Sequence, residues 1–263
     1  MRALQTAATG MMAQELNVQV ISNNIANLRT TGYKRQQAQF QDLLYENLKR
    51  PGSATSDQGN QMPAGLALGS GVKTVSTPRT MSQGSLTATE KTYDVAVRGE
   101  GYFKIRMPDG TAAYTRDGSF DLDSQGQLVT QNGYVVEPGI TVPTNATGVT
   151  ISAGGIVQGT IPGQAAQQNL GTIQLSRFIN KTGLASIGDN LFTETAASGQ
   201  PIDGPPSSDG FGNLQQSYLE DANVNAVTEI SSLIAAQRAY EMNSKVVTAA
   251  DQMLSTIGQM FGR

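Results

Sequence analysis

The chain has 263 residues, a formal net charge of −3 and 15% charged residues, with no Cys, His or Trp. It is long enough to form a real core, and it has no excess of basic charge that would favour nucleic acid as a partner. The missing residue types exclude disulfides, thiol or imidazole catalysis and metal centres held by Cys or His. The low charge suits a protein whose faces contact other protein, and neither a cofactor nor a metal is expected.

The first 30 residues carry a heptad pattern of apolar residues, interrupted only by Gln14. The pattern predicts a helix that ends near residues 27–32, where Asn27 and Gly32 are stop signals. Gly10 lies inside this helix, where it costs about 1 kcal/mol relative to Ala and would let another helix approach closely. The predicted seam is Leu4, Ala7, Met11, Gln14, Val18, Ile21, Ile25 and Leu28.

A longer helix is predicted from Asn225 to Ile257, a stretch without Pro or Gly. One seam is Leu233, Ala236, Tyr240, Asn243, Val247, Ala250, Leu254, Ile257 and Phe261; a second, beside it, is Ala239, Met242, Val246, Ala249, Met253, Thr256 and Met260. Two adjacent seams form a wider apolar face than one partner helix needs. Two arrangements are possible: a two-helix coiled coil within one chain, or packing on several neighbouring copies. We favour the assembly.

Between the two helices the apolar pattern changes to a period of two. Residues 93–98 and 102–107 alternate, and short apolar runs follow at 119–123, 127–130, 134–136, 149–152, 173–178 and 191–194. Turn signals stand at Pro108-Asp109-Gly110, Asp117-Gly118 and Asn132-Gly133. Short strands separated by turns, with no long helix among them, predict an all-β region.

The predicted fold class is α+β, with long N- and C-terminal helices forming a coiled-coil-like domain around a central all-β domain. The helical domain is assigned to residues 1–32 and 220–263, and the β domain to 76–197. Two connectors join them: residues 33–75, which include a Gly/Pro-rich stretch at 51–71, and residues 198–219. Taken by composition alone, the Gly/Pro-rich stretch is an extended loop or linker.

The candidates for chemistry are weak. Residues 121–126 resemble the first half of a calcium loop, but the twelfth position is Asn132 and not the Glu that such a loop needs, so a β-turn explains them better. Four carboxylates of the β region could in principle serve a glycosidase, which needs two; they are Asp94, Glu100, Asp117 and Asp121. A solvated face is the simpler explanation, and no catalytic residue is assigned.

Both ends of the chain carry recognisable sequence motifs. The N-terminal motifs are Ala8-Thr-Gly-Met-Met12, Ile21-Ser-Asn-Asn-Ile-Ala-Asn27 and Thr30-Thr-Gly-Tyr-Lys34. The C-terminal motifs are Tyr218-Leu-Glu-Asp-Ala-Asn-Val224, Gln237-Arg-Ala-Tyr-Glu-Met-Asn-Ser-Lys245 and Thr248-Ala-Ala-Asp-Gln-Met253. These motifs resemble those of bacterial flagellar rod and hook proteins. Because both sets stand at the expected ends of one chain, the resemblance to the family is specific.

The resemblance implies a structural subunit, not an enzyme, that polymerises helically into the drive shaft crossing the periplasm. The length of the chain and the 51–71 stretch favour the distal rod. The alternatives are a proximal rod or hook subunit and, less favoured, a carboxylate-based wall hydrolase. The implied partners are further copies, proximal rod proteins, the hook or hook junction, the outer-membrane and peptidoglycan bushing rings, and the type III export apparatus. Export would leave the N-terminus in place, since no cleaved signal peptide is expected.

Two sets of residues are assigned to assembly. The expected subunit interface is Leu4, Met11, Val18, Ile21, Ile25, Leu28, Leu233, Tyr240, Met242, Val246, Val247, Met253, Leu254, Ile257 and Phe261. The resemblance further implies that the Gly/Pro-rich stretch stiffens the shaft by lying against adjacent subunits; the residues assigned to this role are Pro51, Met62, Pro63, Leu66 and Leu68.

Overall fold

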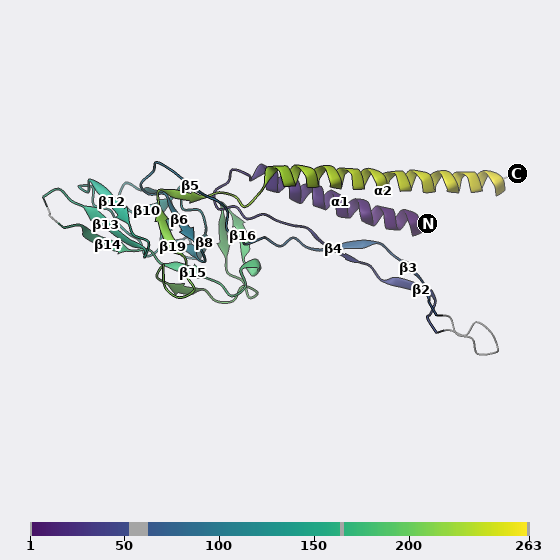
Figure 1. The fold of residues 1–263 in the computed structure, drawn as a ribbon, viewed down its shortest axis with the longest axis horizontal. Coiled ribbons are helices and arrows are strands. Elements are labelled where there is room, and N and C mark those ends of the chain that lie inside the picture. Colours follow the sequence, from purple (N-terminus) through teal and green to yellow (C-terminus); the bar gives the residue numbers. More distant parts are fainter. Residues whose placement is uncertain (1, 53–62, 164–165, 262–263) are drawn as a thin grey trace. The chain divides into compact units, whose positions relative to one another are not determined.

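The computed structural model describes residues 2–52, 63–163 and 166–261, which divide into two compact units. We call Met1–Ile25, Gln36–Pro78 and Ala226–Arg263 the helical unit, and Ala26–Arg35 and Arg79–Asn225 the β unit. Within the described residues, an α-helix at each end of the chain flanks a β-rich middle (Figure 1). The α+β fold class is therefore confirmed.

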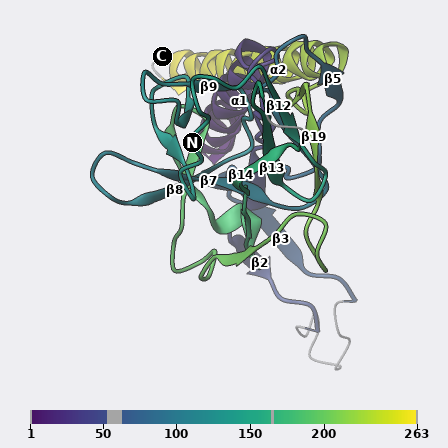
Figure 2. The same ribbon diagram turned by 90° about the vertical axis from the view of Figure 1, so that its left-hand side faces the viewer.

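The helical unit contains α1 (Arg2–Ala26) and α2 (Ala226–Phe261), close to the predicted bounds. Asn24, near the end of α1, meets Glu229 near the start of α2, whereas Gly10 meets Asn243 further along α2. The two helices therefore lie side by side and antiparallel (Figures 1 and 2). Helix α2 continues past Ile257 and through Gly258, where the sequence predicted its end.

The helical unit also contains a ribbon of two short ladders, which we call the arm. Strand β1 (Gln39–Asp42) pairs with β4 (Val72–Ser76), and β2 (Tyr45–Lys49) pairs with β3 (Leu66–Gly69), both antiparallel. The sequence predicted only an extended connector here. Every residue of β2 and β3 is exposed, so these strands have no buried face to impose the alternation by which a strand is recognised.

The β unit is built on a nine-stranded sheet. Its main path runs β16 (Ala185–Gly188), β17 (Leu191–Thr193), β8 (Ala112–Thr115), β7 (Tyr102–Arg106), β11 (Val135–Val136), β10 (Leu128–Thr130) and β9 (Phe120–Leu122). Strand β15 (Leu175–Arg177) pairs with β7 and with β18 (Ile202–Gly204). The predicted turn at residues 108–110 joins β7 to β8, and Asn132-Gly133 joins β10 to β11, so both turn predictions are confirmed.

Three smaller ladders complete the β unit. They are β12 (Gly148–Ile151), β13 (Ile156–Thr160) and β14 (Gln168–Thr172); β6 (Val95–Arg98) with β19 (Asn213–Gln216); and β5 (Leu86–Ala88) with β20 (Tyr218–Glu220). A short 3-10 helix spans Lys181–Gly183. The core has fully buried Phe103 and Phe120 rings packed edge to face, 5.0 Å between centroids. Residues 198–219, which the sequence assigned to a return connector, contain strands β18 and β19 of the β unit.

Candidate assembly surface

The predicted interface residues of α1 are partly covered within one chain. Ile21 is buried, and the half-buried residues are Leu4, Met11, Val18, Ile25 and Leu28. Met12, which the heptad pattern places off the seam, is 65% exposed. Helix α1 therefore keeps apolar surface that the described part of its own chain leaves in contact with solvent.

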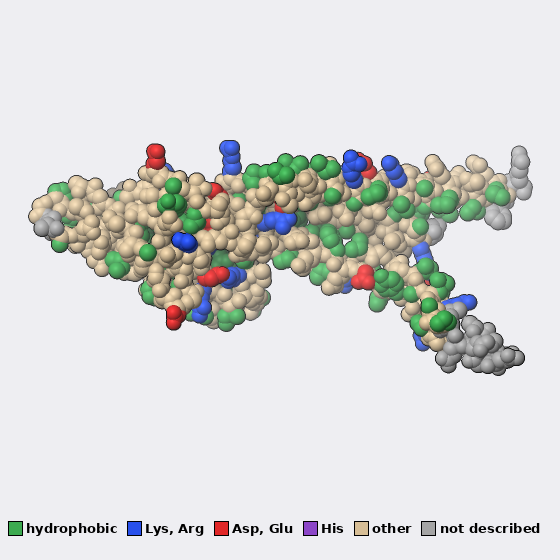
Figure 3. All heavy atoms as spheres, viewed as in Figure 1, with side chains coloured by type: hydrophobic (Ala, Val, Ile, Leu, Met, Phe, Trp, Pro, Cys, Tyr) green, Lys and Arg blue, Asp and Glu red, His purple; other side chains and the backbone are tan. Residues whose placement is uncertain are grey.

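The predicted interface residues of α2 are more exposed. Leu233 and Val247 are half-buried; the exposed members are Tyr240, Met242, Val246, Met253, Leu254 and Ile257. Every residue from 251 to 260 is exposed, over about 15 Å of helix. The side chain of Phe261 lies outside the described residues. Figure 3 shows hydrophobic side chains gathered along the helices of the helical unit.

One exposed apolar row on α2 was missed by the sequence analysis. Val227, Ile230 and Ile234 stand three and four residues apart, and all three are exposed. The same spacing rule that identified the other seams could have found this row. It extends the apolar surface of α2 to the first turn of the helix.

The contact between α1 and α2 in one chain includes a buried polar pair and a close approach of the two backbones. Nδ2 of Asn24 donates to Oε2 of Glu229 at 3.1 Å, and both side chains are fully buried. A Cβ on Gly10 would lie 2.9 Å from Nδ2 of Asn243, which confirms the predicted close approach. The buried small residues of α2 are Ala236 and Ala250. This contact leaves most of the large apolar side chains of α2 outside it.

The residues assigned to the stiffening stretch are solvent-exposed where the structure describes them. Pro51, Pro63, Leu66 and Leu68 are exposed, with Leu66 and Leu68 in strand β3. Met62 lies outside the described residues. These positions therefore offer apolar surface on the arm, available to a neighbouring molecule.

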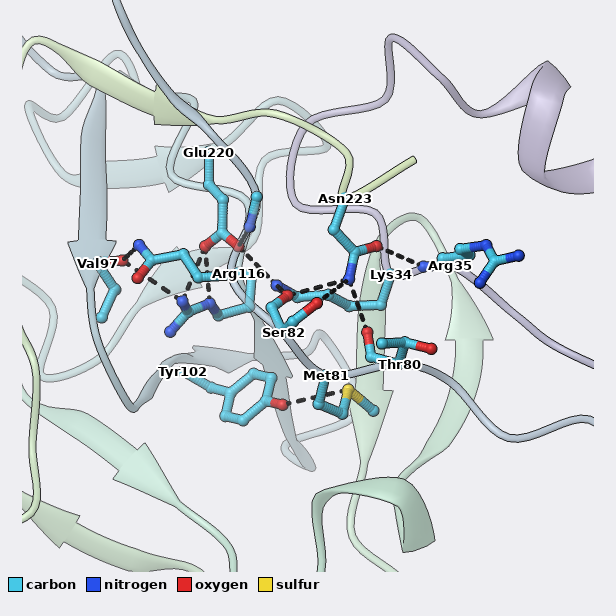
Figure 4. Close-up of polar contacts among 12 residues, drawn as sticks. Lys34, Arg35, Thr80, Met81, Ser82, Val97, Tyr102, Arg116, Glu220 and Asn223 are labelled. Carbon is cyan, nitrogen blue, oxygen red and sulfur yellow. Dashed lines mark hydrogen bonds and ion pairs between the residues drawn. The ribbon is translucent and has the colours of Figure 1, made fainter. Parts of the chain in front are cut away.

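A buried cluster in the β unit joins the two terminal motifs (Figure 4). Oε1 of Glu220 accepts from Nζ of Lys34 at 2.5 Å and from the N–H of Gly84 at 3.0 Å. Oε2 accepts from Nε and Nη2 of Arg116 at 2.9 and 2.8 Å. Lys34 closes the motif at residues 30–34, and Glu220 lies in the motif at 218–224. These two motifs therefore meet through a buried ion pair.

Both cations of this cluster also donate to backbone carbonyls. Nζ of Lys34 donates to the carbonyl of Ser82 at 2.9 Å, and Nη1 of Arg116 donates to that of Gly101 at 2.5 Å. Burial lowers the pKa of the Lys34 amino group, and the neighbouring Glu220 carboxylate opposes that shift. Because the cluster is buried, each charge depends on its partners for solvation.

Asn223 and Gly32 close the same junction. Nδ2 of Asn223 donates to the carbonyl of Thr80 at 2.8 Å, and its Oδ1 accepts the N–H of Arg35 at 2.7 Å. Gly32 adopts a φ of +68°, and a Cβ there would lie 2.9 Å from the backbone carbon of Arg116. Only glycine meets both conditions. The motifs that contain these residues resemble family signatures, but periodicity and composition assign Asn223 and Gly32 no role at this junction.

Three of the four carboxylates considered for catalysis have separate partners, Asp121 with Lys91 among them, whereas Oδ1 of Asp94 is buried without a hydrogen-bond partner in the described part of the chain. Glu100 forms an ion pair with Lys181, and Asp117 accepts from the N–H and hydroxyl of Ser119. Asp123, in the calcium-like segment, accepts the N–H groups of Gln125 and Gln127, as a turn residue does. Among the described residues, no group of three or more acidic side chains is placed to hold a metal ion.

Within the part of the chain that the structure describes, neither helix is apolar enough over a sufficient length to cross a lipid bilayer.

Comparisons with known proteins agree on one family. Residues 4–34 match a model of flagella basal body rod proteins, residues 96–159 the flagellar hook protein FlgE/F/G D1 domain, and residues 215–260 the C-terminal region of the flagellar basal body rod FlgEFG proteins. The first and last of these ranges contain all six of the terminal motifs quoted above.

Full-length relatives point the same way. The chain is 55% identical to the flagellar basal-body rod protein FlgG of Caulobacter vibrioides, with 99% of each chain covered. It is 48% identical to FlgG of Borreliella burgdorferi, over 97% of this chain and 96% of the relative. It is 35% identical to FlgG of Bacillus subtilis, with 98% of each covered. The chain therefore belongs to the flagellar basal-body rod proteins, a family of structural subunits and not of enzymes.

Proposed function

We propose that this chain is the distal rod subunit, which polymerises helically into the rigid shaft that carries torque from the motor to the hook. The observation that carries the proposal is the apolar surface of α2, where Met253, Leu254 and Ile257 are exposed. Burying a side chain of this kind stabilises an assembly by about 1.5–3 kcal/mol. A second copy that covers several of them would gain enough to hold a permanent contact.

The expected interface on both helices follows from the same surface. The coiled-coil-like packing that the heptads predict would form between copies, because the contact within one chain uses small and polar residues at Asn24, Glu229 and Gly10. The domain limits proposed from the sequence, with an inner helical layer and an outer β layer, suit a shaft of this kind.

The partners proposed from the family are the proximal rod proteins, the hook or hook junction and the bushing rings of the peptidoglycan and outer membrane. The rod would cross the periplasm after export through the flagellar type III apparatus. Full-length similarity to FlgG proteins supports the distal rod over a proximal rod or hook subunit.

The proposal is tested by the double variant Leu254→Asp/Ile257→Asp. Both side chains are exposed and lie on the stretch of α2 in which every residue from 251 to 260 is exposed, so the change leaves the described packing of the single chain intact. Two carboxylates placed in a subunit contact would lose their hydration without gaining a partner, and each would destabilise the contact by several kcal/mol. We expect electron microscopy to show polymers of the wild type and none of the variant.

The matched control is Ile179→Asp, which places a charge at an 85% exposed apolar position of the β unit. We expect it to polymerise as the wild type does. Polymers of normal length from the Leu254→Asp/Ile257→Asp variant would contradict the assignment of α2 as the assembly surface.

A further inference from the structure

A groove runs between α1 and α2. Glu15 and Val18 line it from α1, and Gln237, Tyr240 and Glu241 line it from α2, around a volume of about 620 Å³. Val18 and Tyr240 provide apolar surface, and the two carboxylates give the groove a negative charge. Within the described residues, neither Glu15 nor Glu241 forms an ion pair. The groove would therefore accept an apolar segment that carries positive charge.

The arm has this chemistry. Its outer ladder, β2 with β3, is exposed on both faces and presents Tyr45, Leu48 and Leu68 to solvent. A two-stranded ribbon without a covered face is only marginally stable in water, so it gains most from a partner. Lys49 is the last residue of β2 and Arg50 follows it. Among the described residues, neither of these two basic side chains forms an ion pair.

The arm of one chain is held away from that chain's own groove. Glu46 forms an ion pair with Arg2, and the N–H of Val72 donates to Oγ1 of Thr9 at 3.4 Å, so the arm lies along this side of α1. Val18 stands nine positions after Thr9, about two and a half helical turns, and therefore on the opposite side of α1. A second copy must supply the segment that fills the groove.

We propose that the end of the arm of one copy, Leu48–Arg50 (residues 48–50), docks in the α1–α2 groove of another copy. Leu48 enters between Val18 and Tyr240, and the two basic side chains lie against Glu15 and Glu241. The proposal rests on the proposed function, because it requires a polymer. In this arrangement the arm attaches to a neighbouring subunit through this one contact.

Charge reversal with rescue tests the docking. Glu15→Lys/Glu241→Lys and Lys49→Glu/Arg50→Glu each turn attraction into repulsion, and all four positions are exposed, so folding of the single chain is preserved. We expect each double variant to raise the protein concentration needed for polymerisation about tenfold. The quadruple variant should return to within about threefold of the wild type. A quadruple variant no better than its parents would overturn the docking.

Cysteine cross-linking gives a second readout without background, because the natural chain has no Cys. A disulfide between Val18→Cys and Leu48→Cys needs Cα atoms within about 7 Å. Oxidation of polymers of the double variant should produce covalent dimers and longer ladders. Val18→Cys paired with Ile179→Cys, an exposed position of the β unit, should produce none. Polymers that form normally but do not cross-link would overturn the docking while leaving the proposed function standing.

Discussion

At the residue scale, the Glu220 cluster decides how well the two terminal motifs stay together. Glu220→Ala leaves Lys34 and Arg116 buried without a counter-charge, so the free energy of unfolding should fall by about 3–5 kcal/mol. Urea denaturation followed by tyrosine fluorescence measures this loss. Glu90→Ala is the matched control, because Glu90 is exposed, and it should change stability by less than about 0.5 kcal/mol. Equal losses from both variants would show that the cluster contributes nothing special.

Two buried tyrosines predict how stability changes in alkali. Burial raises the pKa of Tyr102 and of Tyr114 to about 12. Between pH 10 and 12 the unfolded chain loses these protons first, so stability falls as the pH rises through this window. Each residue should cost about 1 kcal/mol at pH 11. The lowered pKa of Lys34 acts in the opposite direction below its ordinary value of 10.5.

The comparison that isolates this effect is Tyr102→Phe against the wild type, with unfolding measured at pH 9 and pH 11. The contribution of Lys34 is common to both proteins and cancels. The variant should lose about 1 kcal/mol less than the wild type over this interval, whereas Tyr240→Phe, at an exposed position of α2, should follow the wild type. Parallel losses in all three proteins would contradict the prediction.

At the scale of the element, the close approach of α1 and α2 at Gly10 makes a sharp prediction. Gly10→Ala gains helix propensity of about 1 kcal/mol, but its Cβ would meet Asn243 at 2.9 Å. In the Asn243→Ala background that obstacle is gone. We therefore expect Gly10→Ala to stabilise the helical unit more in the Asn243→Ala background than in the wild type, by thermal melting followed at 222 nm. Identical effects in both backgrounds would mean that the helices do not meet there.

The two helices should also differ along their length in the free monomer. Residues 229–243 of α2 pair with α1 through Glu229 and Asn243, whereas residues 251–260 are exposed on every side. Hydrogen exchange should therefore be slower in the first segment than in the second, because local opening costs more where contacts must break. Uniformly fast exchange over both helices would show that they pair only on assembly.

The elements differ in how far sequence could predict them. The two helices and strands such as β6 and β7 were predicted because their apolar residues repeat with the period of the element. The strands of the arm were missed because β2 and β3 have no buried face. The dipeptide Asp117-Gly118 was predicted as a turn, but it joins β8 and β9, which do not pair with each other. Gly118 instead allows a close approach to Val95.

The candidate site was predictable in part for a related reason. Exposed apolar positions such as Met253 follow from helical periodicity. The buried pair Lys34–Glu220 does not, because 186 positions separate its members and a charged side chain is normally taken to be solvated. The pairing depends on how the β unit brings both motifs to one point, and periodicity carries no information about that.

At the scale of the whole molecule, residues 51–66 are predicted to keep the shaft straight and stiff. Pro51 and Pro63 restrict the unbound chain and so reduce the entropy lost when the stretch is held against a neighbour. Deleting 51–66 should leave polymerisation intact, because the exposed surface of α2 is unchanged, but the polymers should bend more easily. Their persistence length, measured from electron micrographs, tests this.

The control replaces the stretch with a Gly/Ser segment of equal length, which separates the effect of chain length from the effect of contact with a neighbour. If contact stiffens the shaft, the deletion variant and the Gly/Ser variant bend alike. Shafts of the deletion variant as straight as those of the wild type would mean that stiffness comes from the helices and the β unit alone, and that the stretch is only a linker.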